Sequence, residues 1–176
     1  MKNLISALLA ALALFISGCS LTNYPPLDTV DNVDVQRYLG KWYEIASLPN
    51  NFQKGCSCSS AEYSMIDSTT IRVVNKCFKE GKLDDVNGKA FVVEGSGNSK
   101  LKVQFFWPFR GDYWIIDLDK NNYSYAVVGT PSRKYMWILS RTPMMEESLY
   151  SSILEKSKAN GFDVNKVVMT KQDCSE

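Results

Sequence analysis

Few residue types in this sequence are suited to catalysis or metal binding. It contains five cysteines and no histidine among its 176 residues. Histidine is the usual general base of serine and cysteine hydrolases and the commonest ligand of zinc and haem iron. An enzyme would have to use carboxylates, tyrosine or lysine instead, and the pattern offers no second inward carboxylate to pair with Glu44. We therefore expect no catalytic residue, no metal site and no cofactor.

Four of the cysteines, Cys56, Cys58, Cys77 and Cys174, lie in the body of the chain. An even number in an exported domain predicts two disulfides, with three possible pairings. Cys56-Ser57-Cys58 could also suggest a redox or metal pair. The spacing is not Cys-x-x-Cys, and no second pair of ligands accompanies it, so structural disulfides are favoured.

The fifth cysteine, Cys19, follows a secretion signal. The apolar run from Leu4 to Ile16 is too short to cross a bilayer comfortably. It ends in Ile16-Ser17-Gly18-Cys19, which resembles a bacterial lipobox, so we expect cleavage before Cys19 and lipidation of that residue. The alternative is an ordinary signal peptide that a cysteine happens to follow. Ser20, where an Asp would favour inner-membrane retention, indicates the outer membrane, facing the periplasm.

Charge and composition define the remaining segments. Lys2 is the only charged residue of the first 18, so the rest of the chain carries 19 basic and 19 acidic residues. No basic block is present, and we expect no nucleic-acid partner. We divide the chain into a signal peptide (1–18), a lipidated tether containing Pro25-Pro26 (19–35) and one domain (36–176).

The domain consists of short strand-like runs separated by turn signals. Eight such runs at this spacing predict an antiparallel meander closed into an up-and-down β-barrel, a mainly β fold whose interior can hold one small ligand. The expected strands cover residues 40–48, 58–66, 70–78, 88–94, 100–107, 112–118, 123–130 and 134–141.

A single helix is expected after these strands. Thr142 would cap it, Pro143 would occupy its first position, and Gly161 would follow its end. An apolar stripe should pack this helix on the outside of the barrel; it consists of Leu149, Tyr150, Ile153 and Leu154. A last short strand is expected at 166–170.

Two motifs about 100 residues apart carry a family resemblance. Gly40-Lys41-Trp42 matches the Gly-x-Trp signature of the lipocalins, and Arg141 in "MWILSRTP" matches the arginine after their last barrel strand. The sequence most resembles bacterial outer-membrane lipoprotein lipocalins and their relative apolipoprotein D. The resemblance runs from about Val33 to Cys174. It implies that Gly40, Trp42 and Arg141 close the barrel base, with the guanidinium lying across the indole.

The resemblance also implies the disulfide pairing. In apolipoprotein D-like lipocalins, a cysteine five residues before the tyrosine of "AEYS" pairs with the C-terminal tail. Cys58 has that spacing from Tyr63, so the resemblance implies Cys58–Cys174 and leaves Cys56–Cys77 as the second bond.

Alternate strand residues should line the barrel interior. Counting from Arg141 places Leu139 and Trp137 inside. On the neighbouring strand we expect Tyr125 and Val127 inside, and family matches add Ala61 and Val73. The full expected ligand-binding set is Tyr63, Asn75, Phe105, Trp107, Tyr113, Trp114, Tyr125, Trp137 and Leu139.

The resemblance implies a membrane-anchored carrier of fatty acids or lysophospholipids, acting as a monomer or homodimer. The acyl chain would be buried in the barrel. The head group would stay at the mouth, near Lys54 and Arg110, although solvation is the ordinary use of such residues. Two alternatives remain: an enzyme of lipid or epoxide chemistry, or an envelope scaffold with a filled barrel.

Overall fold

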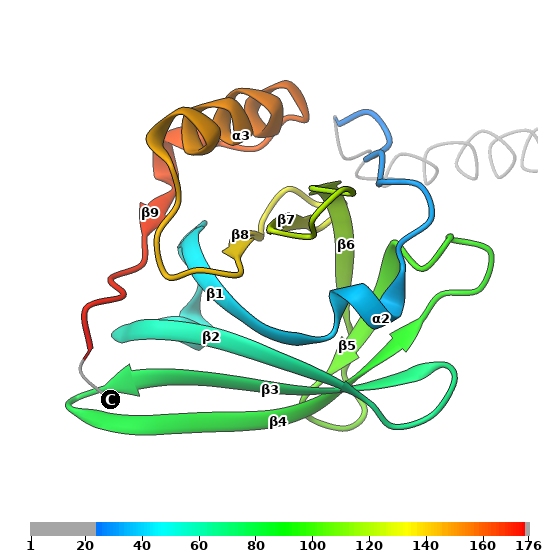
Figure 1. The fold of residues 1–176 in the computed structure, drawn as a ribbon, viewed down its shortest axis with the longest axis horizontal. Coiled ribbons are helices and arrows are strands. Elements are labelled where there is room, and N and C mark those ends of the chain that lie inside the picture. Colours follow the sequence, from blue (N-terminus) through cyan, green and yellow to red (C-terminus); the bar gives the residue numbers. More distant parts are fainter. Residues whose placement is uncertain (1–23, 175–176) are drawn as a thin grey trace, which may run out of the picture.

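The computed structural model describes residues 24–174 and forms one β-barrel with a helix against it (Figure 1). The barrel strands are β1 (Gly40–Ser47), β2 (Cys56–Met65), β3 (Thr70–Lys79), β4 (Lys82–Val92), β5 (Lys100–Gln104), β6 (Gly111–Leu118), β7 (Tyr125–Gly129) and β8 (Met136–Ser140). The other elements are α2 (Val35–Tyr38), η2 (Asn51–Gln53), α3 (Glu147–Ala159), η3 (Val164–Lys166) and β9 (Val168–Met169).

Each barrel strand pairs antiparallel with the next, and β8 pairs with β1, which also pairs with β2. This closure confirms the predicted eight-stranded antiparallel barrel with a C-terminal helix. The short strand β9 pairs antiparallel with Ala46 and Ser47, at the C-terminal end of β1. Within residues 24–174, no helix has the length and apolar character needed to cross a membrane.

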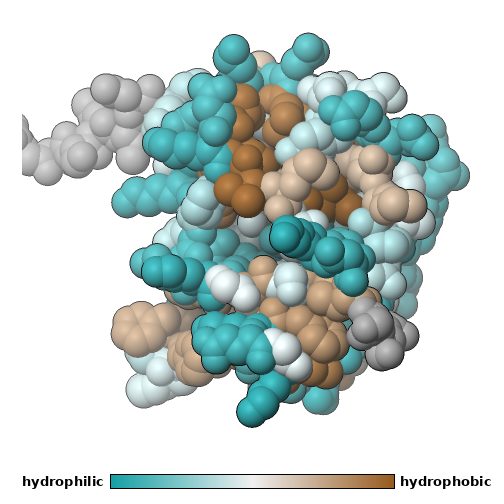
Figure 2. All heavy atoms as spheres, turned by 90° about the vertical axis from the view of Figure 1, so that its left-hand side faces the viewer, coloured by the Kyte–Doolittle hydropathy of each residue, from teal (hydrophilic) through white to brown (hydrophobic). Residues whose placement is uncertain are grey.

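The alternation of strand direction gives the barrel two distinct ends. The base is the end where α2 leads into β1, and it carries the loops 66–69, 93–99 and 119–124. The mouth is the opposite end, with the loops 48–55, 80–81, 105–110 and 130–135. Figure 2 views the side with β9 and the tip of the β3–β4 hairpin, where apolar side chains reach the surface in patches broken by polar ones.

Two apolar clusters lie on opposite faces of the barrel wall. One fills the lumen and includes Trp42, Tyr63 and Leu139. The other lies outside, between the wall and α3, and contains Ile138 and Ile153. The expected apolar stripe of the helix packs here, with Leu149, Tyr150 and Leu154 beside the buried Ile153.

The predicted boundaries differ most from the structure at the start of β4 and at the start of the helix. β4 begins at Lys82, six residues before the predicted start, because the polar stretch 82–87 continues the hairpin with β3. The helix begins at Glu147, not at Pro143. The Thr142 hydroxyl donates to the Met144 carbonyl (2.7 Å) and therefore does not cap a helix at this point.

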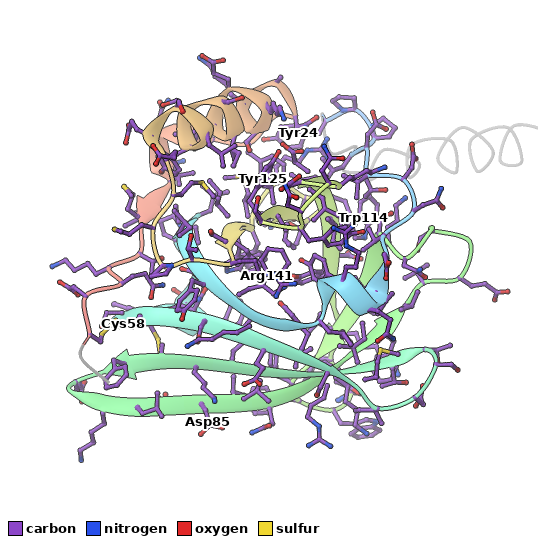
Figure 3. The ribbon with its side chains drawn as sticks, in the orientation of Figure 1. Tyr24, Cys58, Asp85, Trp114, Tyr125 and Arg141 are labelled. Atoms are coloured by element: carbon purple, nitrogen blue, oxygen red, sulfur yellow. A yellow bond between two sulfur atoms is a disulfide. The ribbon has the colours of Figure 1, made fainter. Side chains whose placement is uncertain are left out.

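The expected tether is partly packed onto the barrel. Leu27 and Val33 are buried, and the Val30 amide donates to the Ile115 carbonyl (3.0 Å). The guanidinium of Arg133, in the mouth loop 130–135, donates to the Pro25 carbonyl (2.7 Å). Residues 25–33 therefore run along the outer wall from the mouth to the base. Figure 3 shows Tyr24 beside the end of α3.

Two disulfides fix the mouth end and the tail. Cys58 is bonded to Cys174 (2.03 Å), and Cys56 is bonded to Cys77 (2.09 Å), the pairing that the resemblance implied. The first bond attaches the C-terminal tail to β2. The second joins β2 to β3, its neighbour in the sheet.

Candidate functional site

The barrel base is closed by Trp42 and Arg141. Trp42 is fully buried, and the Arg141 guanidinium carbon lies 3.8 Å from the centre of its ring. The same guanidinium donates to the carbonyls of Lys41 (2.8 Å) and Arg37 (2.7 Å). This arrangement combines a cation–π contact with hydrogen bonds to the backbone before and at the start of β1.

Gly40 permits this close approach at the base. Its φ of +88° is in the left-handed region, and a Cβ there would lie 3.5 Å from the Arg141 guanidinium. A side chain would therefore be strained by the backbone as well as placed against the arginine. The Gly-x-Trp spacing and the distant arginine thus meet in one structural unit, as the family resemblance implied.

Three tyrosines occupy the lumen directly above this base. The Tyr113 hydroxyl lies 2.8 Å from that of Tyr38 and 3.0 Å from that of Tyr63. Burial raises the pKa of Tyr63 to about 12 and the pKa values of Tyr38 and Tyr113 well above that of free tyrosine. The three hydroxyls therefore remain protonated at neutral pH and satisfy one another. Tyr38 was not among the predicted residues, and its only signal in the sequence is its place four residues before Trp42.

Little free space remains around these hydroxyls. The cavity that they border has a volume of about 10 Å³, room for about one water. Its wall is completed by Ile71, Ala90, Leu101 and Val103. The space for a ligand in the lumen therefore lies between the tyrosines and the mouth.

Several predicted residues do face the lumen. Trp137 and Phe105 are half-buried and pack on the lumenal cluster, and Leu139 is buried within it. Asn75 pairs with Ala61, a lumenal residue, and so shares its face. Phe105 packs over Gly88, where a Cβ would lie only 2.7 Å from the phenyl ring.

Three of the predicted lumenal residues face outward instead. Tyr125, Val127 and Trp114 belong to the outer cluster under α3, and Figure 3 shows Tyr125 near the helix. The expected inward orientation is wrong because directly opposed residues share a face. Leu139 is opposite Ala126 and Trp137 is opposite Val128, so these small residues line the lumen.

Trp107 is also outside the lumen, contrary to the prediction. β5 ends at Gln104, and Trp107 lies in the following mouth loop with 86% of its surface exposed. Lys54 and Arg110 are exposed in mouth loops, as expected. The Arg110 guanidinium lies over the Phe91 ring at 4.2 Å.

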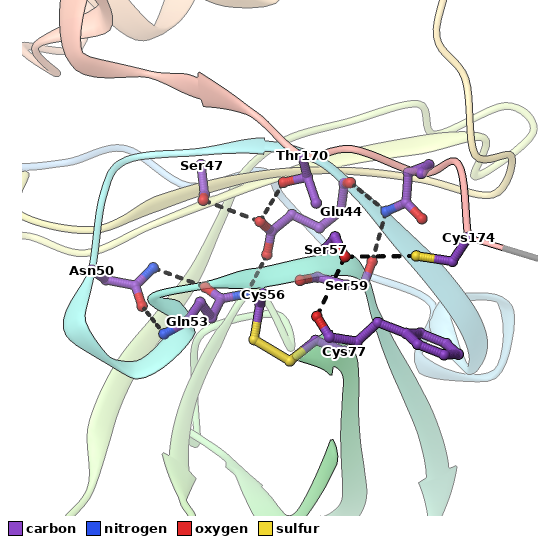
Figure 4. The surroundings of a disulfide bond; sticks show 12 residues. Glu44, Ser47, Asn50, Gln53, Cys56, Ser57, Ser59, Cys77, Thr170 and Cys174 are labelled. Carbon is purple, nitrogen blue, oxygen red and sulfur yellow. Dashed lines mark hydrogen bonds between the residues drawn. A yellow bond between two sulfur atoms is a disulfide. The ribbon is translucent and has the colours of Figure 1, made fainter. Parts of the chain in front are cut away.

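A polar network that the sequence did not reveal connects the mouth to the C-terminal tail. Glu44 is buried, and its carboxylate accepts hydrogen bonds from Ser47 (3.1 Å), Thr170 (2.6 Å) and the Gln53 amide (Figure 4). Gln53 also accepts from the Trp137 indole (2.9 Å). This network holds η2 at the rim and fixes the orientation of a lumenal tryptophan.

Aromatic stacking extends the wall beyond Trp137. Tyr135 stacks on Trp137 with ring centres 6.0 Å apart, and Phe52 lies 5.8 Å from Tyr135. Neither Phe52 nor Tyr135 was predicted. Phe52 lies between two expected strands, and Tyr135, although inside the expected strand 134–141, precedes the observed start of β8 at Met136.

A larger hollow of about 310 Å³ lies outside the barrel, between α3 and the outward face of β6 and β7. Its wall contains the Lys156–Asp117 ion pair (2.9 Å), and Ile116 and Val127 are the apolar residues that the strands contribute. The hollow is not part of the lumen.

A closed antiparallel barrel with a sealed base and a partly aromatic mouth is the architecture of proteins that hold one small apolar molecule. A family model described as a lipocalin-like domain matches residues 33–172. The chain belongs to the lipocalin family.

Individual relatives agree with this assignment. The chain is 40% identical over 162 residues to outer membrane lipoprotein Blc of Vibrio cholerae, covering 91% of this chain and 94% of that one. It is 32% identical to bovine apolipoprotein D over 87% and 84% of the two chains. Insecticyanin from Manduca sexta shares the fold, with a TM-score of 0.70 at 23% identity over 87% of both chains. The outer-membrane relatives indicate the same location, with a lipid anchor, for this chain.

Proposed function

We propose that this protein is a non-catalytic carrier that stores or transports a fatty acid or lysophospholipid in the cell envelope. The acyl chain would enter at the mouth, lie against Trp137 and Phe105, and extend toward Leu139 deeper in the lumen. The polar head would remain at the mouth. The observation that carries the proposal is a lumen closed at its base and lined by aromatic and aliphatic side chains toward its open end.

The depth available to the ligand follows from the tyrosine cluster. Burying a CH₂ group yields about 0.8 kcal/mol, so a long chain gains affinity with each carbon that enters the lumen. The protonated hydroxyls of Tyr63 and Tyr113 mark the floor of this site and offer the lumen's deepest polar groups. Asn75 supplies an amide partway up the wall.

The burial and hydrogen bonding of Glu44 support a non-catalytic role. Within residues 24–174, it is the only buried acidic side chain, and three neighbouring donors occupy its carboxylate. It has no second buried carboxylate with which to share acid–base work.

The anchor at Cys19 is part of the proposal. The signal peptide and the segment 19–23, which includes Cys19, lie outside the described residues. Lipidation there would keep the barrel at the outer membrane, facing the periplasm, next to a supply of poorly soluble ligand. The division into residues 1–18, 19–35 and 36–176 is proposed on the same basis, and the carrier could act as a monomer or a homodimer.

The test uses the signal-free chain with Cys19→Ser. Palmitate or a lysophospholipid should bind one-to-one by native mass spectrometry and should perturb tryptophan emission. Trp137→Ala should weaken binding about tenfold or more. Trp114→Ala, which removes a tryptophan from the outer face, is the matched control and should bind normally.

A scaffold is the competing interpretation, and the small cavity at the base favours it. No adduct with either lipid class would decide for the scaffold. Equal affinity of the two tryptophan variants would instead refute the place of the acyl chain against Trp137. Circular dichroism of both variants separates a lost contact from a lost fold. If Trp137→Ala unfolds, Trp137→Leu, which keeps apolar volume, takes its place.

A further inference from the structure

The mouth loop 105–110 exposes an unusual amount of aromatic surface. Phe106, Trp107 and Phe109 are 72%, 86% and 77% exposed, respectively. The Phe109 amide donates to the Phe106 carbonyl (2.9 Å), so all three lie on one tight turn. Large aromatic side chains are normally buried or at an interface, because exposing them to water is unfavourable.

The chemistry of this loop fits a lipid surface. The sequence "FFWPFR" contains no acidic residue, and its one charge is on Arg110. Tryptophan favours the boundary between head groups and acyl chains, and arginine can extend its charge to the head groups while its stem stays in apolar surroundings. A water-facing loop would instead be expected to carry polar residues.

The N-terminal segment leaves the barrel at this same end. The buried side chain of Arg133 donates to the Pro25 carbonyl and lies 5.3 Å from the centre of the Tyr24 ring. Arg133 lies in the mouth loop 130–135. Because β6 pairs with β7, that loop and the aromatic loop 105–110 are neighbours around the rim.

The short length of chain between Cys19 and Tyr24 limits the orientation of the barrel relative to the membrane. Five residue steps separate Cys19 from Tyr24, which span at most about 18 Å when fully extended. β1 has eight residues, and barrel strands are tilted by about 40° from the barrel axis. Its length projected on that axis is therefore about 20 Å, which approximates the distance from base to mouth. A barrel resting on its base would hold Tyr24 at least that far away, with α2 and the base loops added. If instead the mouth faces the membrane, Tyr24 lies close enough to the lipid surface for residues 19–24 to span the distance.

We propose that the loop 105–110 inserts its aromatic side chains into the periplasmic leaflet of the membrane that holds the anchor, and that this contact turns the barrel mouth toward the lipid. The orientation rests on the proposed lipidation of Cys19, and the insertion itself rests on the exposed aromatic turn. Ligand could then pass between leaflet and lumen without crossing bulk water.

The experiment compares two double variants of the signal-free chain carrying Cys19→Ser. Trp107→Ser/Phe109→Ser removes two exposed apolar side chains from the mouth. Ile66→Ser/Met144→Ser removes two exposed apolar side chains from elsewhere on the surface. Partitioning onto vesicles of phosphatidylethanolamine and phosphatidylglycerol is measured by flotation, and insertion depth by quenching of Trp107 with brominated lipids.

We expect the mouth variant to partition at least about tenfold less than the parent chain and the control variant to partition like the parent. Brominated lipid should quench the parent more strongly than a Trp107→Phe variant. Equal partitioning of the two double variants, or no partitioning of the parent, would overturn the proposal. So would a parent dimer, seen by sedimentation, that only the mouth variant abolishes, since a second copy would then cover the loop.

Palmitate binding in vesicle-free solution separates this proposal from the carrier proposal. The mouth variant should bind palmitate like the parent, because neither replaced side chain lines the lumen. A parent that inserts into vesicles but binds no lipid in its lumen would refute the carrier alone. A parent that binds lipid but does not partition would refute the docking alone.

Discussion

Replacing Trp42 by Ala tests whether the barrel base depends on its contact with Arg141. Trp42 is fully buried, its indole donates to the Tyr38 carbonyl (2.8 Å), and its ring lies 5.0 Å from that of Tyr38. Emptying such a site costs about 3–5 kcal/mol in the free energy of unfolding. At about 2–4 °C per kcal/mol for a domain of this size, the melting temperature should fall by roughly 6–20 °C.

Arg141→Ala should cost less, about 2–3 kcal/mol. The guanidinium donates to three backbone carbonyls, including that of Tyr123 (3.3 Å), but water can replace part of these bonds because the group is only partly enclosed. Removing both partners removes their mutual contact only once. The double variant should therefore fall short of the summed single costs by about 1–2 kcal/mol.

Urea unfolding with both disulfides intact measures these energies. The matched control pairs Arg141→Ala with Trp114→Ala, which removes a tryptophan stacked under Lys100 (4.2 Å) on the outer face. That combination should be additive within about 0.5 kcal/mol. Additive energies for Trp42 and Arg141 as well would show that the observed contact contributes nothing to stability.

Two further predictions concern the lumen and the disulfides. Tyr63 ionises at a lower pH in the unfolded chain than in the folded one, where its pKa is raised to about 12. The stability that the protonated Tyr63 confers is therefore present below pH 10 and is lost as the pH rises toward about 12. In urea melts, the free energy of unfolding of Tyr63→Phe should fall less steeply with alkaline pH than that of the parent. A disulfide that closes a longer loop restricts the unfolded chain more. Replacing Cys58 and Cys174 by Ala, which opens a loop of 116 residues, should cost about 5 kcal/mol, and replacing Cys56 and Cys77, which opens a loop of 21 residues, should cost about 3 kcal/mol. Equal costs in thermal melts would contradict this dependence on loop length.

The barrel could be predicted from the residues because eight turn-bounded strands are enough to suggest closure. The base followed from the family resemblance of Gly40, Trp42 and Arg141, since no local pattern predicts a contact between residues about 100 positions apart. The polar half of β4 was missed for a physical reason. The β3–β4 hairpin turns at Glu80-Gly81, both with positive φ, and its tip is largely solvated, so residues 82–87 show no apolar alternation.

The faces of β7 could not be assigned from the sequence. The run Tyr125–Gly129 is apolar on both faces because the lumen covers one and α3 covers the other. Alternation then separates two sets of residues without saying which set is inside. The register with β8 settles the question, since Tyr125 is opposite Ser140 and Ala126 is opposite Leu139. β6 adds a second difficulty, because the register shift between Ile115 and Asp117 interrupts its alternation.

The orientation of Trp107 could not be predicted from the sequence either, for a different reason. Aromatic residues continue from Phe105 to Phe109, so composition alone suggests one unbroken lumenal wall. The ladder with β6 ends at Val103, however, and the turn from Phe106 to Phe109 carries the later rings away from the barrel. Phe105 packs inward over Gly88, whereas Trp107 faces outward two residues later. The end of this short strand therefore divides the aromatic run into a wall for a ligand and an exposed rim, and the two need separate tests.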